Sequence, residues 1–121
     1  MQNYKDLKVW EKSHQFTLRV YETTQSFPKE EIYSLTNQLR RSAASIPANI
    51  AEGCGKNSQL EFAHFLNISL GSSNETEYYL ILAKDLKYFT NEIYEDLFAK
   101  INEIKAMLIL LIGKVRNDLK T

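Results

Sequence analysis

The stretch RRSAASIPANIAEG, residues 40–53, places a proline inside an otherwise helix-forming segment. Pro47 removes one backbone hydrogen bond and its ring crowds the carbonyl of Ala43, so we predict a helix that kinks at Pro47. Around the proline the side chains are small, which lets a partner helix approach closely. The same is true of a later segment, at Ser69, Gly71, Ser72 and Ser73. We predict that these two regions pack together, with Ser42 or Ser45 relieving the backbone strain by side-chain hydrogen bonds; the alternative is that Pro47 is tolerated near an exposed turn.

Four segments of the chain repeat apolar residues every three or four positions, which indicates amphipathic helices. We expect them at about residues 7–26, 28–52, 58–88 and 91–119. In the first, the predicted inward residues are Leu7, Trp10, His14, Thr17 and Tyr21. In the second they are Leu35, Leu39, Ala43, Ile46 and Ile50. In the fourth they are Leu97, Ile101, Ile104, Leu108, Leu111 and Val115.

Proline, glycine and capping residues between these segments predict short loops. Pro28 suits the first turn of a helix, and the glycines on either side of Cys54 are expected to end the second helix in a left-handed conformation. Ser58 and Glu61 form a capping-box pattern that opens the third helix. No segment alternates with period two. Short loops favour antiparallel neighbours, so we predict an all-α, up-down-up-down antiparallel four-helix bundle in one domain, residues 1–121.

The composition restricts the function classes. Lys+Arg and Asp+Glu number 15 each, so the chain has no net charge and gives little support to broad, non-specific nucleic-acid affinity. Cys54 is the single cysteine, which suits a reducing compartment. The longest apolar run, AMLILLI at 106–112, is well short of the ~20 residues that span a bilayer. The N-terminus does not resemble a signal peptide, so we expect a cytoplasmic location and no membrane partner.

Some apolar residues lie off the predicted inward stripes. Each apolar side of a helix must be buried, but in a single four-helix bundle the outward sides of the helices are exposed to solvent. These surplus residues therefore predict self-association, the alternative being that they pack under loops or chain ends. The predicted oligomer interface comprises Val9, Phe16, Val20, Met107, Ile109 and Ile112.

Polar residues in the second helix allow two interpretations. Arg40 and Arg41 point about 100° apart, so one is expected to reach solvent or phosphate and the other a carboxylate such as Glu75. Asn49 and Glu52 are neighbours on one helix surface. The favoured interpretation is a structural polar network of Arg41, Asn49, Glu52 and Glu75, and the other is a binding site.

Enzymatic chemistry finds little support. Two Glu-x-x-His pairs, Glu11/His14 and Glu61/His64, resemble half of a di-iron site in a helical bundle. At the same height the fourth helix offers Leu111 and Ile112 rather than a carboxylate, and Glu103 lies roughly 12 Å away along the axis. Cys54 has no histidine placed beside it by the sequence, and the segment after it lacks the spacing of a phosphate-binding loop. We predict no enzymatic activity, no metal and no cofactor.

Three motifs together resemble a known family. They are LKVW at 7–10, LRRSAASIPANIAEG at 39–53 and FLNISLGSSNETE at 65–77. They resemble the four-helix-bundle proteins encoded within bacterial 23S rRNA intervening sequences, a family similar to the accessory variability protein of diversity-generating retroelements. The resemblance covers nearly the whole chain. It implies a ring-shaped homopentamer without known enzymatic activity and with a suspected role in binding nucleic acid. By this resemblance the family's polar positions match Arg40, Arg41, Asn49, Glu52 and Glu75.

The retroelement accessory proteins are strongly basic, whereas this chain is neutral. A ring could still repeat a weak basic patch, and its predicted members are Lys8, Lys12, Arg19, Arg40, Arg41 and Lys56. We therefore expect a homo-oligomer that serves as an accessory module for RNA or DNA or a ribonucleoprotein. The alternative is a scaffold ring that docks a protein partner without contacting nucleic acid.

Overall fold

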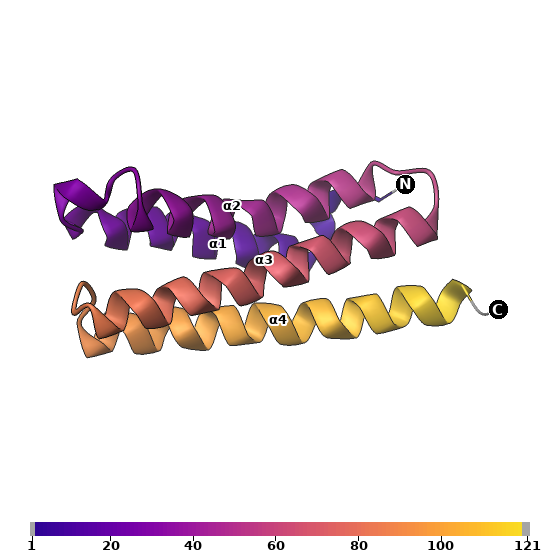
Figure 1. Cartoon of the computed structure of the whole chain (residues 1–121). Coiled ribbons are helices and arrows are strands. Elements are labelled where there is room, and N and C mark those ends of the chain that lie inside the picture. Colours follow the sequence, from indigo (N-terminus) through magenta and orange to yellow (C-terminus); the bar gives the residue numbers. More distant parts are fainter. Residues whose placement is uncertain (1, 120–121) are drawn as a thin grey trace.

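Four long helices make up the computed structural model, which describes residues 2–119 (Figure 1). They are α1 (Lys8–Thr23), α2 (Leu35–Cys54), α3 (Gln59–Asp85) and α4 (Asn91–Leu119). Single 3-10 turns precede and follow α1, at Tyr4–Asp6, Thr24–Ser26 and Lys29–Glu31. No strand occurs between residues 2 and 119, which confirms the all-α prediction.

The helices run up and down around a common core, in chain order (Figure 1). Each helix packs against the next one, and α1 also packs against α4, so that the bundle is closed. The start of α1, the α2–α3 loop and the end of α4 lie at one end, and the α1–α2 link and the α3–α4 turn lie at the other. The predicted antiparallel four-helix bundle is confirmed.

The core confirms two of the predicted inward stripes and corrects the third. All five predicted residues of α2 are buried, and on α4 only Leu111 is half-buried rather than buried. On α1 Thr17 is buried as predicted, but the other buried residues include Val9, Ser13, Phe16 and Val20 in place of the rest of the predicted stripe. Tyr21 is 44% exposed, so the predicted α1 stripe was rotated about the helix axis.

The ends of α2 differ from the prediction. The helix begins at Leu35, because the residues after Pro28 form a separate 3-10 turn. It continues through Gly53, and its C-cap Gly55 has φ −84°, so neither glycine is left-handed. Gly53 is needed for space instead: a Cβ there would lie 2.9 Å from Phe65 Cβ. The positive φ, 65°, belongs to Lys87, after the end of α3 at Asp85.

Pro47 lies inside α2, which continues as one helix on both sides of it, while the kink itself stays a prediction. The carbonyl of Ala43, which would accept from residue 47 in a regular helix, accepts from Thr17 Oγ1 of α1 at 3.2 Å. Thr17 Oγ1 also lies 2.8 Å from the carbonyl oxygen of Ser13, so its single hydrogen is shared. The compensation for the proline therefore comes from α1.

Hydroxyl groups connect α2 to α3. Ser69 Oγ donates to the Ile46 carbonyl at 2.8 Å, and Ser45 Oγ lies 2.9 Å from Ser72 Oγ. Further along, Thr76 Oγ1 donates to Ser42 Oγ at 2.9 Å. These bonds confirm that the two small-residue regions pack together, and we call them the hydroxyl seam.

Candidate interaction surfaces

The two adjacent arginines have separate roles. Arg40 packs at the α1–α2 junction, where Nε donates to Thr24 Oγ1 at 2.8 Å and Nη2 to the Tyr21 carbonyl at 3.3 Å. Its guanidinium also lies over the Tyr21 ring, 4.8 Å from the centroid. Arg41 is exposed and makes no hydrogen bond or ion pair with any residue between 2 and 119. Arg41 is thus the outward-facing arginine.

The predicted polar network does not form as one unit. Asn49 Nδ2 donates to the carbonyl and the hydroxyl of Ser45, at 2.8 and 2.9 Å, which extends the hydroxyl seam. Glu52 instead pairs with Lys56 at 3.8 Å. Glu75 accepts from Tyr79 Oη at 3.0 Å.

Arg41 and Glu75 share only the wall of a shallow depression of about 280 Å³, together with Gln38, Ser42 and Ser45. No ion pair joins the two charges within the described part of the chain. The four predicted members therefore divide among three local contacts and one unpaired cation, because each partner lies within four residues in the sequence.

The predicted basic residues also do not form one free patch on the single chain. Lys12 pairs with Glu103 at 3.0 Å, and Arg19 pairs with Glu22 and, at 3.4 Å, with Asp96. Lys56, besides its pair with Glu52, lies over the Phe65 ring. Of the six predicted cations, only Lys8 and Arg41 lack a hydrogen bond, ion pair or ring contact among residues 2–119.

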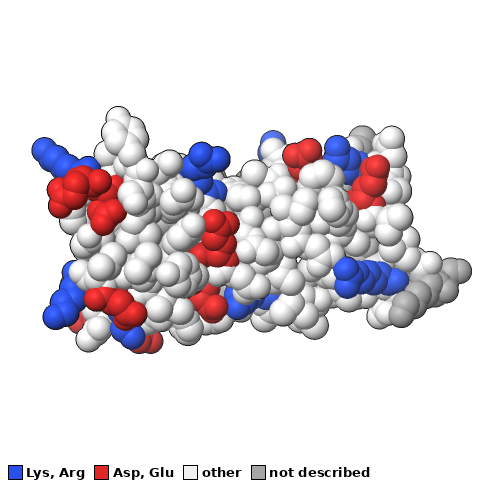
Figure 2. Space-filling view, viewed as in Figure 1, with Lys and Arg blue, Asp and Glu red and all other residues white. Residues whose placement is uncertain are grey.

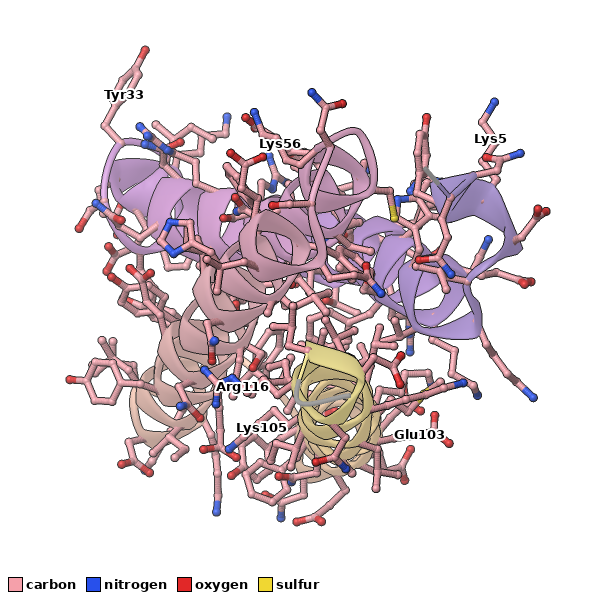
Figure 3. All side chains as sticks on the ribbon, turned by 90° about the vertical axis from the view of Figure 1, so that its right-hand side faces the viewer. Lys5, Tyr33, Lys56, Glu103, Lys105 and Arg116 are labelled. Carbon is pink, nitrogen blue, oxygen red and sulfur yellow. The ribbon has the colours of Figure 1, made fainter. Side chains whose placement is uncertain are left out.

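Charges of both signs alternate over the molecule. Figure 2 shows blue and red side chains interspersed along one face, with no continuous basic field. The end-on view in Figure 3 shows that Lys5, Lys56 and Arg116 lie apart around one end of the bundle. A phosphate backbone would therefore meet isolated cations on one subunit.

Ion pairs line the α1–α4 contact. In addition to the pairs of Lys12 and Arg19, Asp96 binds Lys100 on its own helix. The hydrogen bond from Lys100, with a second from Arg19, holds the pKa of the Asp96 carboxyl below its usual range. On the opposite side of α4, Lys105 pairs with Glu77 of α3 at 3.3 Å (Figure 3). These ion pairs engage cations that, from the sequence alone, were expected to be available to bind phosphate.

The two histidines contact aromatic rings, and the cysteine is buried. The ring of His14 stacks on Trp10, with 5.2 Å between centroids, and His64 is exposed beside Phe65. Within residues 2–119 no three His, Cys, Asp or Glu side chains are grouped closely enough to hold a metal ion. Cys54 is buried and unpaired, and burial raises the pKa of its thiol.

The predicted oligomer interface needs correction. Val9, Phe16, Val20 and Ile112 belong to the core of the monomer and cannot meet a second copy. Met107 is half-buried, and Ile109 is exposed as predicted. The four wrong residues follow from the rotated stripe on α1 and from the choice of Leu111 over Ile112 on α4.

Two groups of exposed apolar residues occur instead, on opposite sides of the bundle. Leu110 is 75% exposed and Leu60 is 68% exposed, and they belong to a group that we call the α3–α4 face: Leu60, Tyr78, Ile81, Ile109 and Leu110. The other group, the α1–α2 face, consists of the exposed residues Leu18, Tyr21 and Ala48 with the half-buried residues Trp10, His14, Ala44 and Ala51. The predicted interface shares Ile109 with these groups, and Leu110 is outward by its spacing, because it lies about 180° from Ile101 on α4.

The fold and these surfaces define an all-helical bundle with two apolar faces. A family model for 23S rRNA-intervening sequence proteins matches residues 5–110. The chain therefore belongs to the 23S rRNA-intervening sequence protein family, as the sequence motifs indicated.

A solved structure supports this membership. It is a protein with unknown function from the S23 ribosomal protein family of Bacteroides thetaiotaomicron VPI-5482, 36% identical, with a TM-score of 0.81. The alignment covers 87% of this chain and 95% of that one. No curated protein matches the chain. Within residues 2–119, no helix has the length and apolar character that crossing a membrane requires.

Proposed function

We propose that this protein is a cytoplasmic, non-enzymatic homo-oligomer, a ring of five copies, that serves as an accessory module for nucleic acid or a ribonucleoprotein. The observation that supports this proposal best is the pair of unlike apolar faces on opposite sides of the bundle. A two-fold dimer needs one self-complementary patch, whereas a closed ring needs two different patches that fit each other. In the ring, the α3–α4 face of one copy covers the α1–α2 face of the next.

The chemistry of the two faces is complementary. Leu110 and Leu60 project bulky side chains, whereas α2 contributes only the small side chains of Ala44, Ala48 and Ala51 to the other face. Burying one exposed leucine contributes about 1.5–3 kcal/mol, so a few such contacts at each junction are enough to matter. The ring would also repeat Arg41 and Lys8 five times, which concentrates cations that are isolated on one subunit.

The ring is tested by absolute mass in solution. Five copies of 14.1 kDa give roughly 70 kDa by light scattering at physiological salt. Leu110→Glu places a charge on the α3–α4 face and is expected to reduce the mass to that of a monomer. Leu86→Glu is the matched control, because Leu86 is also exposed but lies in the α3–α4 turn. A wild-type mass of roughly 14 kDa, or equal masses for both variants, contradicts the assembly through this face.

Nucleic-acid contact is tested by a salt series. Phosphate contacts make the logarithm of the binding constant fall linearly with the logarithm of salt concentration. Binding of labelled RNA and DNA to the assembled ring should weaken steeply with salt, and Arg41→Gln should both weaken binding and flatten that slope. Lys105→Gln is the control, because Lys105 is already paired with Glu77. Binding that is absent at low salt contradicts the nucleic-acid part of the proposal.

A second candidate is a scaffold ring that binds a protein partner. It is favoured by the ion pairs of Lys12, Arg19 and Lys56, which engage half of the cations predicted to bind phosphate. Binding through an apolar face depends weakly on salt. A ring that assembles but binds neither RNA nor DNA would therefore support the scaffold.

A further inference from the structure

Thr36 is an exception in an otherwise satisfied interior. It is the second residue of α2, it is 2% exposed, and its hydroxyl has no hydrogen-bond partner. No other buried side-chain nitrogen or oxygen among residues 2–119 lacks a partner. A buried hydroxyl without a partner destabilises the folded state, so such a group requires an explanation.

The same threonine lines a depression of about 300 Å³ at the end of the bundle that contains the α1–α2 link. Thr24, Gln25, Lys29 and Arg40 supply its other polar groups. Phe27, Pro28 and Ile32 supply an apolar wall. A small cavity with an apolar wall and a few polar groups has the make-up of a site for a small ligand.

The polar groups of this depression carry an excess of positive charge. No Asp or Glu lines it, whereas Arg40 and Lys29 both do. Arg40 uses Nε and one hydrogen of Nη2 for Thr24 and Tyr21, which leaves Nη1 and the other Nη2 hydrogen available. Lys29 is exposed and forms no ion pair within residues 2–119.

In the 3-10 turn that follows Pro28, Glu31 is already engaged. Glu31 Oε2 accepts from Tyr88 Oη at 2.7 Å, and its Oε1 lies 3.4 Å from the backbone nitrogen of Leu35. Thr24 Oγ1 is likewise satisfied, because it accepts from Arg40 and donates to the Val20 carbonyl at 2.7 Å. The residues lining the depression that still have a hydrogen to donate are therefore Arg40, Lys29, Gln25 and Thr36, whose hydroxyl is buried in the wall. All of them can donate a hydrogen bond to an anion.

We propose that this depression binds a phosphate ester that carries an apolar ring, as in a nucleotide. The Arg40 guanidinium presents N–H groups to phosphate oxygens, a geometry that favours two parallel hydrogen bonds. A rotation of the buried Thr36 side chain lets its hydroxyl donate to a third oxygen, and Lys29 adds charge at the rim. The ring of the ligand packs against Pro28 and Ile32. This site involves one subunit and does not depend on the proposed assembly.

The test is calorimetric titration with adenosine 5′-monophosphate, adenosine and inorganic phosphate. The nucleotide should bind more tightly than either fragment. Thr36→Val keeps the side-chain shape and removes the donor, so it should weaken nucleotide binding by about tenfold or more. Thr36→Ser should keep most of the affinity. Lys29→Gln should weaken it by about threefold. Lys87→Gln, in the neighbouring α3–α4 turn, should leave it unchanged.

The unfolding temperature of the free protein supplies the second readout. Thr36→Val should raise it, because the unpaired hydroxyl is gone, and nucleotide should then add less stability than it adds to the wild type. Equal nucleotide affinity of the wild type and Thr36→Val overturns the proposal, as does equal affinity for adenosine and the nucleotide. An oligoribonucleotide with and without a terminal phosphate distinguishes the sources: a preference for the phosphorylated strand assigns the site to an RNA end, and none assigns it to the free nucleotide.

Discussion

Gly53→Ala should destabilise the protein, although alanine is the better helix former. Gly53 lies in the last turn of α2, where α3 approaches closely. A Cβ at this position would meet Phe65 Cβ at 2.9 Å and Phe62 Cδ1 at 3.1 Å. Phe65 Cβ is fixed to the backbone of α3, so the overlap cannot be relieved by turning a side chain.

The magnitude follows from two opposing effects. Alanine in place of a helical glycine contributes about 1 kcal/mol. Overpacking of this kind costs about 1–3 kcal/mol, and a contact between backbone-anchored atoms belongs in the upper half of that range. We expect a net loss of about 1–2 kcal/mol. Gly71→Ala and Gly113→Ala are the matched controls, because a Cβ at either position meets nothing within 4 Å, and each should gain about 0.5–1 kcal/mol.

Urea unfolding followed by circular dichroism measures all three variants at one protein concentration, so that any assembly contributes equally. A shift of the midpoint without a change of slope reports stability alone. The reasoning is refuted if Gly53→Ala is as stable as Gly71→Ala, since the α2–α3 approach would then tolerate a methyl group.

Three further outcomes are expected. Thr17→Val should lower the free energy of unfolding by about 1 kcal/mol. The loss should be smaller in a Pro47→Ala background, because the amide of an alanine at position 47 can then donate to the Ala43 carbonyl. A double-mutant cycle in urea measures this coupling. The pKa of Asp96 is lowered in the folded state, so its ionised carboxylate stabilises the fold. This stabilisation is fully present above the unfolded pKa of about 3.8 and is lost as the pH falls through the lower folded pKa. Asp96→Asn should therefore reduce the acid sensitivity of unfolding, by less than about 1 kcal/mol because the pairs are exposed. Cys54 should react with iodoacetamide much more slowly in the folded protein than in urea, since burial both raises the pKa of its thiol and blocks access; equal rates would contradict its burial.

Much of the architecture could be predicted from the sequence. The bounds of α4 and the buried stripe of α2 follow from apolar spacing, because both helices place aliphatic residues inward with little interruption. The α1 stripe was wrong for a physical reason. Of the predicted residues only Thr17 is buried, and on the correct side the hydroxyl of Ser13, which donates to the Trp10 carbonyl, interrupts the apolar run of Val9, Phe16 and Val20.

The surfaces were less predictable than the core. Whether Lys12 or Arg19 is free depends on Glu103 and Asp96, which are far away in the chain and become neighbours only when α1 meets α4. Similarly, nothing in the sequence marks Thr36 as unsatisfied, because its surroundings combine the α1–α2 link with the first turn of α2. Local spacing fixes which side of a helix a residue occupies, and the tertiary partners then decide what remains available.

The α2–α3 contact and the α1–α4 contact are held by different kinds of interaction. This difference determines which helices we expect to unfold first. The hydroxyl seam holds α2 to α3 with directional, mostly buried bonds, whereas the edge between α1 and α4 has exposed ion pairs above Phe16 and Ile104. Salt weakens only the second kind of contact. We expect amide hydrogens of α1 to exchange before those of α2 and α3, and increasingly so as ionic strength rises. The hairpin of α2 and α3 is then the part of the molecule that keeps its structure longest.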